Sequence, residues 1–168
     1  MLASKLNYKR GIQIGISLVV LLTTSVSLAT EQVYLYSLKA LRLNAKFSLA
    51  SLSDKPKVAV VFQPNCAWCI KQAADLARLQ NECSGEFETV LIGSRAKRQA
   101  LKRELRHFSD ETPALQADPQ FIRQIGGVEA TPVTLFFDQA GNLLGRKQGY
   151  LPVTKLRQAI AIQTNKAC

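Results

Sequence analysis

Two cysteines separated by two residues, Cys66 and Cys69, form the clearest chemical motif in this chain of 168 residues. They follow an apolar run at 58–62 and begin a segment with helical spacing that extends to about residue 81. A thiol attacks a disulfide only as its thiolate, and the free N–H groups at a helix N-terminus favour that anion. Cys66 is therefore the predicted nucleophile, and Cys69, one helical turn later, is placed to resolve a mixed disulfide.

Other uses of a Cys-x-x-Cys pattern need further residues in set places. Covalent haem attachment requires a His directly after the second Cys, where this chain has Ile70. A zinc site needs two more ligands, and the candidates form no second paired motif: Cys83, Cys168 and His107. A purely structural local disulfide remains an alternative. We expect no metal, and no cofactor beyond the dithiol itself.

A second motif, Ala130-Thr131-Pro132, comes directly before an apolar run at 133–137. Proline at the first position of a strand removes a backbone donor, and here we expect a cis Thr131–Pro132 bond. This bond would face the cysteine pair across the end of the sheet and leave backbone groups free to bind a substrate strand. A trans proline that begins an edge strand is the alternative. Trp68 is expected to line the same substrate groove.

The segments around these motifs alternate between strand and helix patterns. Strands are predicted at 58–62, 87–92, 133–137 and 143–150, and helices at 66–81, 95–108, 119–125 and 153–162. Residues 47–52 alternate briefly before a turn cluster at 53–56, whereas 31–46 fit a short strand, a helix or a tether equally well. This order predicts an α/β fold with a mixed central sheet and helices on both faces.

The chain is basic, with 22 Lys and Arg against 12 Asp and Glu, a formal net charge of +10. Many basic residues gather between 95 and 106, where Leu101, Leu105 and Phe108 have helical spacing. We interpret the basic residues as the solvated face of a helix; a docking patch for an anionic partner or a membrane surface is the alternative. No nucleic-acid partner is expected, because no nucleic-acid motif accompanies the charge.

Residues 1–29 have the pattern of a signal peptide or membrane anchor. Lys5, Lys9 and Arg10 precede an uncharged stretch at 11–30, and the small residues Ser27 and Ala29 fit a signal-peptidase site before Thr30. An uncleaved inner-membrane anchor at 11–30 is the alternative, since about twenty apolar residues can span a bilayer. Both interpretations place the rest of the chain outside the cytoplasm.

Taken in order along 46–162, these motifs resemble the thioredoxin-like superfamily, and within it the TlpA/ResA/DsbE group of exported thiol–disulfide oxidoreductases. The resemblance rests on the 58–62 strand before Cys66 and Cys69, on 47–52 as the group's N-terminal hairpin, and on four later motifs: Ala117-Asp118-Pro119, Gly127-Val128, Phe137-Asp138-x-x-Gly141 and Gly149-Tyr150. It implies a redox-active Cys66/Cys69 pair, substrate docking at Thr131-Pro132, and a periplasmic location, soluble or membrane-anchored.

The resemblance also implies a function and a domain division. Members usually reduce disulfides of exported proteins with electrons from a membrane thiol transporter. The alternatives are a disulfide oxidase or isomerase at the same site, and a non-catalytic thioredoxin-like assembly or metallochaperone module. The expected division is a signal peptide or anchor at 1–29, an N-terminal extension at 30–46 and a thioredoxin-like domain at 47–168.

The chain departs from the pattern of its relatives in the active-site segment. Ala67 and Trp68 are an uncommon spacer, and Asn65 stands where Trp or Tyr commonly precedes the first Cys. Val60 stands where thioredoxin has a buried acid, so no proton acceptor is assigned to Cys69.

Two further cysteines lie outside the motif. In a thioredoxin fold the active-site helix and the last helix share one face of the sheet. Cys83 comes just after the former and Cys168 after the latter. We therefore predict a structural Cys83–Cys168 disulfide, with two free thiols as the alternative.

Overall fold

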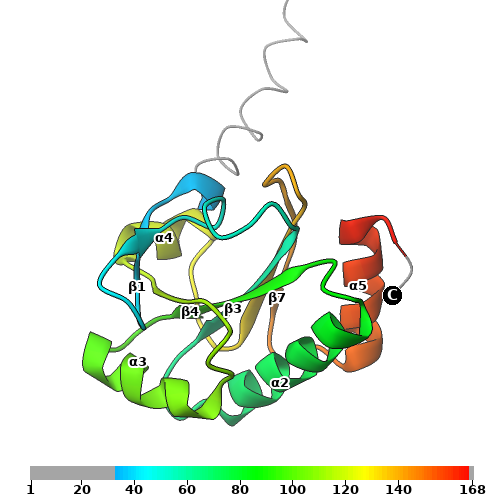
Figure 1. The fold of residues 1–168 in the computed structure, drawn as a ribbon. Coiled ribbons are helices and arrows are strands. Elements are labelled where there is room, and N and C mark those ends of the chain that lie inside the picture. Colours follow the sequence, from blue (N-terminus) through cyan, green and yellow to red (C-terminus); the bar gives the residue numbers. More distant parts are fainter. Residues whose placement is uncertain (1–32, 167–168) are drawn as a thin grey trace, which may run out of the picture.

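A fully buried strand, β3 (Lys57–Phe62), lies at the centre of the fold. The computed structural model describes residues 33–166 (Figure 1). β3 pairs in parallel with β4 (Glu88–Gly93) on one side and antiparallel with β6 (Val133–Phe137) on the other. Its continuous apolar sequence suits this position, because both faces of a central strand in an α/β sheet are covered.

Further strands extend the sheet on both sides of this centre. Beyond β4 lie β5 (Ala114–Gln116), β1 (Leu38–Ala40) and β2 (Lys46–Phe47), and beyond β6 lies β7 (Leu143–Gln148). Within residues 33–166 the sheet has seven strands in the order β2-β1-β5-β4-β3-β6-β7. Parallel and antiparallel pairs both occur, so the predicted mixed sheet is confirmed.

Helices cover both faces of this sheet, as predicted (Figure 1). On one face α2 (Ala67–Glu82), α3 (Arg98–Glu104) and α5 (Val153–Thr164) contribute Leu76, Leu101 and Leu156 to one apolar cluster. On the other face α4 (Pro119–Gln124) contributes Phe121 to a second cluster. Because successive side chains of a strand point to opposite faces, β3 supplies both clusters.

The basic segment forms a shorter helix than the predicted one at 95–108. α3 is followed directly by a single 3₁₀ turn, η2 (Leu105–His107). Most of its basic side chains are exposed, as both the solvated-face interpretation and the docking-patch alternative require. Arg98 differs, because it is half-buried and donates to the carbonyl oxygens of Ala40 and Leu43, and so ties α3 to β1.

The prediction of an N-terminal hairpin at 47–52 is wrong in its position. β2 ends at Phe47, and the chain then turns, with the N–H of Ser51 within 3.2 Å of both the carbonyl and the hydroxyl oxygen of Ser48. Serine hydroxyls offer the backbone local partners, which favours turns over strand pairing. The hairpin lies earlier, where β1 and β2 pair antiparallel in a segment whose sequence indicated no single element.

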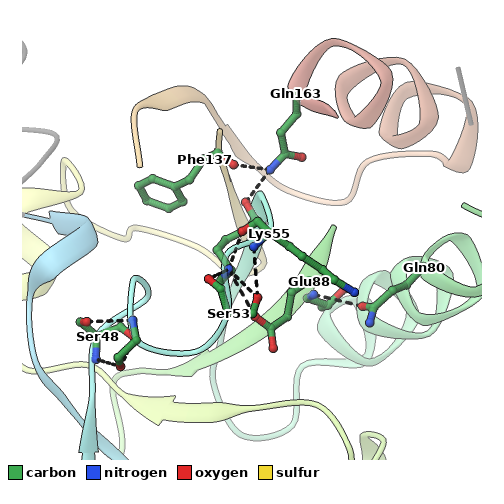
Figure 2. Close-up of polar contacts among 10 residues, drawn as sticks. Ser48, Ser53, Lys55, Gln80, Glu88, Phe137 and Gln163 are labelled. Carbon is green, nitrogen blue, oxygen red and sulfur yellow. Dashed lines mark hydrogen bonds and ion pairs between the residues drawn. The ribbon is translucent and has the colours of Figure 1, made fainter. Parts of the chain in front are cut away.

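A polar network closes the end of the sheet at which β3 begins. The Lys57 ammonium, which has no solvent exposure, donates to the carbonyl oxygen of Ser53 at 2.7 Å and lies 3.4 Å from Glu88 Oε2. Gln163 of α5 donates through Nε2 to the carbonyl of Lys57 at 2.8 Å (Figure 2). Burial lowers the pKa of Lys57, and the Glu88 carboxylate partly offsets that effect. We call Ser53, Lys57, Glu88 and Gln163 the closed end.

The predicted signal peptide or anchor at 1–29, the uncharged stretch at 11–30 and Cys168 lie outside the described residues. Within residues 33–166, none of the helices combines the length and the apolar character that crossing a membrane requires. The first described residues pack on the sheet, with the Tyr34 ring centroid 5.6 Å from that of Phe137.

Candidate active site

The cysteine pair lies where the chain passes from β3 into α2. After β3 the chain passes through Asn65, whose φ of 60° is a left-handed value that Asn tolerates better than most residues. Cys66 then occupies the N-cap of α2, and its Sγ accepts a hydrogen bond from the Cys69 N–H at 3.2 Å. Cys66 and Cys69 are joined in a disulfide with an S–S distance of 2.06 Å. The predicted position of both cysteines is confirmed.

The two sulfurs differ in their access to solvent. Cys66 retains 9% of its surface exposed, whereas Cys69 has none. Cys66 Sγ also lies within reach of two donors, the Cys69 N–H and the hydroxyl of Thr131. Donors at a helix N-terminus stabilise an anionic sulfur. Cys66 therefore has the access and the hydrogen-bond partners that an attacking thiolate requires.

Thr131 and Pro132 face this pair from the start of β6. The Thr131–Pro132 bond is cis, as predicted, and the Thr131 hydroxyl donates to Cys66 Sγ at 3.4 Å. The Pro132 carbonyl accepts the Gly149 N–H at 2.8 Å, so this group is occupied rather than free. Within residues 33–166, no hydrogen bond of the Thr131 backbone is described, which leaves its N–H and C=O as the candidates for pairing with a bound peptide.

Two aromatic side chains pack together next to the cysteine pair. Trp68 is 58% exposed, and its ring centroid lies 5.3 Å from that of Tyr150. The Tyr150 hydroxyl donates to Asp75 Oδ2 at 2.7 Å, and the Lys71 ammonium lies 5.0 Å from the centre of the Tyr150 ring. Hydrogen bonds to Tyr150 and then to Asp75 raise the pKa of Lys71. We call Trp68 and Tyr150 the aromatic ledge.

The cis bond, Cys66 and the ledge are connected through neighbouring residues. Gly149, which holds the Pro132 carbonyl, directly precedes Tyr150 of the ledge. Trp68 stands between the two cysteines in sequence, so the ledge and the disulfide share the first turn of α2. The predicted exposed position of Trp68 is confirmed, and its role in binding a substrate stays a prediction.

Sequence reasoning missed Glu104, the last residue of α3. Its carboxylate Oε1 accepts the backbone N–H of Asn65 at 3.2 Å, directly before the nucleophile, and its side chain is buried. One signal could have found it, because Glu104 is the only acid between 95 and 108 and lies three residues after Leu101, on the apolar side.

The remaining metal and disulfide candidates do not extend this site. Cys83 is buried at the C-terminal end of α2, a whole helix away from Cys66, and His107 is exposed on η2. In the part of the chain that the structure describes, no group of three or more His, Cys, Asp or Glu side chains could hold a metal ion. Because Cys168 lies outside that part, the Cys83–Cys168 disulfide stays a prediction.

The fold and the cysteine pair define a class of protein, and comparison with known families agrees. Residues 43–163 match the thioredoxin-like domain family, and the chain therefore belongs to that family. Family, fold and a Cys-x-x-Cys disulfide at the start of α2 together support disulfide oxidoreductase activity.

Solved structures of similar fold extend this comparison. A putative thiol:disulfide interchange protein DsbE from Chlorobium tepidum has a TM-score of 0.66 at 19% identity, covering 77% of this chain and 92% of that one. DsbF of MTB has a TM-score of 0.65 at 20% identity, covering 78% and 96%. A secreted Mycobacterium tuberculosis disulfide oxidoreductase homologous to E. coli DsbE has a TM-score of 0.63 at 21% identity, covering 79% and 98%. Among curated proteins, none matches this chain.

Proposed function

We propose that the protein acts outside the cytoplasm as a thiol–disulfide oxidoreductase that reduces disulfides of exported proteins through Cys66 and Cys69. The observation that carries this proposal is the contrast between the two sulfurs, with Cys66 accessible at the N-cap of α2 and Cys69 enclosed behind it. An attacking sulfur needs access to the partner, whereas a resolving sulfur needs access only to the first sulfur.

The first step is attack by reduced Cys66. Its thiolate forms a bond to one sulfur of the substrate disulfide, and the other substrate sulfur leaves as a thiolate that takes up a proton from solvent. The Cys69 N–H and the Thr131 hydroxyl, at 3.2 Å and 3.4 Å from Cys66 Sγ, support the anion before attack. The product is a mixed disulfide between Cys66 and the substrate.

The second step is resolution by Cys69. Its thiolate attacks Cys66 Sγ, the substrate's second thiol is released, and the Cys66–Cys69 disulfide seen in the structure is formed. Two electrons have passed from the protein to the substrate. Because Cys69 is held next to Cys66 in the first turn of α2, its attack on the mixed disulfide is intramolecular and has the advantage over attack by an external thiol. A membrane thiol protein returns two electrons and regenerates the dithiol.

Substrate docking involves both sides of the disulfide. The backbone groups of Thr131 form no hydrogen bond within residues 33–166, which supports pairing with an extended substrate segment in the manner of strand addition. On the other side, the aromatic ledge offers exposed apolar surface, and exposed aromatic side chains are frequent anchors of protein interfaces. We propose Thr131, Pro132 and Trp68 as the residues that bind the substrate.

Two observations support the location and the direction of this activity. The basic residues followed by an uncharged stretch at 11–30 support export, with residues 31–168 in the periplasm, either soluble or held at the inner membrane. The resemblance to exported reductants supports the reducing direction. Cell fractionation and N-terminal sequencing test the location, with either a start at Thr30 in the periplasm or an intact N-terminus in the membrane as the expected result.

Equilibration of the Cys66–Cys69 couple with glutathione tests the direction. We expect a reduction potential on the reducing side of about −200 mV, in the range of dithiols that donate electrons. A potential near about −120 mV, typical of a dedicated oxidase, would contradict the proposed direction and leave the dithiol chemistry itself intact.

A further inference from the structure

Glu104 is a buried carboxylate beside the active-site turn, and it forms no ion pair with any of the described residues 33–166. Its side chain is 7% exposed, and Oε1 accepts the Asn65 N–H at 3.2 Å. Among residues 33–166, no Lys, Arg or His side chain forms an ion pair with Glu104. Buried acids are rare unless they are paired, because burial penalises the charge.

Stability alone does not explain an acid at this position. Glu104 is the last residue of α3, and a negative charge at the C-terminal end of a helix is unfavourable. The basic side chains of Lys102 and Arg103 on the same helix are exposed to solvent. Arg95, in the loop before α3, donates instead to the carbonyl of Glu129 at 2.6 Å. Neither the end of the helix nor a basic partner among residues 33–166 favours a carboxylate here, which leaves its contact with the active-site turn as the feature to explain.

Its position relative to the nucleophile indicates what that role is. The N–H that Glu104 holds belongs to Asn65, the residue directly before Cys66, in its left-handed turn. Leu101 and Leu105 of the same segment pack in one apolar cluster with Cys66 and Cys69. The carboxylate thus lies on the face of the sheet that holds the disulfide, where its burial reduces the screening of its charge by solvent.

We infer that Glu104 is a positioning residue that holds the turn before Cys66 and, through its negative charge, disfavours the Cys66 thiolate. The N-terminus of α2 and the Cys69 N–H favour that thiolate, so Glu104 opposes them. A stabilised thiolate stabilises the reduced protein and makes its disulfide a stronger oxidant. By opposing that stabilisation, Glu104 keeps the Cys66–Cys69 couple reducing.

The test compares charge removal with removal of the whole side chain in the full-length protein. Glu104→Gln keeps an oxygen that accepts the Asn65 N–H and removes the charge, whereas Glu104→Ala removes both. Glu111→Gln is the matched control, because Glu111 is exposed on the loop before β5, toward the closed end. The measured quantity is the equilibrium constant of the reaction in which the protein dithiol and oxidised glutathione give the protein disulfide and two reduced glutathiones.

Charge removal is expected to lower this equilibrium constant about five-fold, which corresponds to about 20 mV for this two-electron couple. The same variant, once reduced, is expected to react faster with iodoacetamide at Cys66 at pH 7, as its thiolate is more populated. Glu111→Gln is expected to match the wild type in both measurements. An equilibrium constant for Glu104→Gln within two-fold of the wild type, or one that rises, would overturn the inference.

Two further outcomes are decisive. If Glu104→Ala shifts the equilibrium and Glu104→Gln does not, the side chain holds the turn only and the charge inference fails. If Glu104→Gln does not fold, the alkylation rate of folded Glu104→Ala carries the same prediction of faster reaction. This inference rests on the proposed dithiol cycle, but it concerns a difference between variants. A wild-type potential in the oxidase range would therefore refute the proposed direction and leave the Glu104 effect measurable.

Discussion

The two ends of β3 differ in how far their functional groups are buried and bonded within the protein. At the closed end, Lys57 has no exposure, and its ammonium donates to Ser53 and lies 3.4 Å from Glu88. Figure 2 labels Ser53 and Glu88 at this end. We call the other end the open end; it comprises Cys66, Trp68 and Thr131. Its sulfur, aromatic ring and backbone groups remain available to a partner protein. Cys66 Sγ has donors but no covalent partner other than Cys69, and Trp68 presents its ring to solvent.

The difference shows where this fold places stability and where it places chemistry. Buried polar groups that hydrogen-bond across elements hold those elements in place, as the Nε2 of Gln163 does by joining α5 to β3 and β6. Groups that keep an exposed surface or an available reactive or hydrogen-bonding atom can bind a partner protein. Changes at the open end should therefore alter activity with little effect on stability, and changes at the closed end should do the reverse.

The largest expected effect is the loss of activity in Cys66→Ser. Without this sulfur no mixed disulfide forms, so reduction of a protein disulfide such as those of insulin should fall to the uncatalysed rate. Thermal unfolding of the reduced variant should match that of the reduced wild type. Residual activity above that of a Cys66→Ser, Cys69→Ser double variant would show that another group performs the exchange.

Lys57→Met tests the closed end with a side chain of similar length. The variant leaves the Ser53 carbonyl without its donor and Glu88 without its cation, which should lower the free energy of unfolding by about 2 kcal/mol. Lys147→Met, on exposed β7, is the control and should change it by less than about 0.5 kcal/mol. A Lys57→Met protein of full stability but altered reduction potential would reverse the comparison.

Trp68→Ala removes the exposed half of the aromatic ledge. We expect kcat/KM for a protein disulfide to fall about ten-fold, equivalent to about 1.4 kcal/mol, since a lost aromatic anchor weakens docking. The reduction potential should stay unchanged. Ile162→Ala is the matched control, because Ile162 is 77% exposed on α5 and outside the site. Equal losses in the two variants would indicate that the ledge has no special role in docking.

The smallest expected effect is a pH dependence at the closed end. Burial lowers the pKa of Lys57 in the folded protein below its ordinary value of 10.5. Between the folded pKa and 10.5 the unfolded chain binds one more proton, so stability from this group rises with pH across that window. Chemical denaturation should show the wild type gaining stability relative to Lys57→Met as the pH rises toward 10.5. A difference that stays flat or reverses would argue against a destabilised ammonium.

Sequence reasoning succeeded where a local pattern determines the structure. The apolar run at 58–62 and the cysteine spacing predicted β3, α2 and the site between them, because burial on both faces and helix capping act over a few residues. Thr131 before Pro132 predicted the cis bond that faces Cys66. The strand, the helix and the position of the cysteine pair need no knowledge of distant contacts.

Sequence reasoning failed where contacts between distant parts of the chain determine the structure. β1 pairs with β5, more than seventy residues later, and its three residues carry no pattern strong enough to indicate a strand. Glu104 reaches Asn65 across thirty-nine positions, and Lys57 is buried beside Glu88 of the neighbouring strand β4. The local sequence predicts exposure for both residues, because Glu104 lies among basic residues and Lys57 directly precedes an apolar run.

The most direct test of the central claim is to trap the mixed disulfide. Cys69→Ser, incubated with a disulfide-bonded exported protein and quenched with acid, should accumulate a covalent complex whose only intermolecular bond maps to Cys66. Cys66→Ser treated in the same way should accumulate none. A complex that maps to another cysteine, or equal trapping by both variants, would contradict the assignment of Cys66 as the sulfur that exchanges bonds with partner proteins.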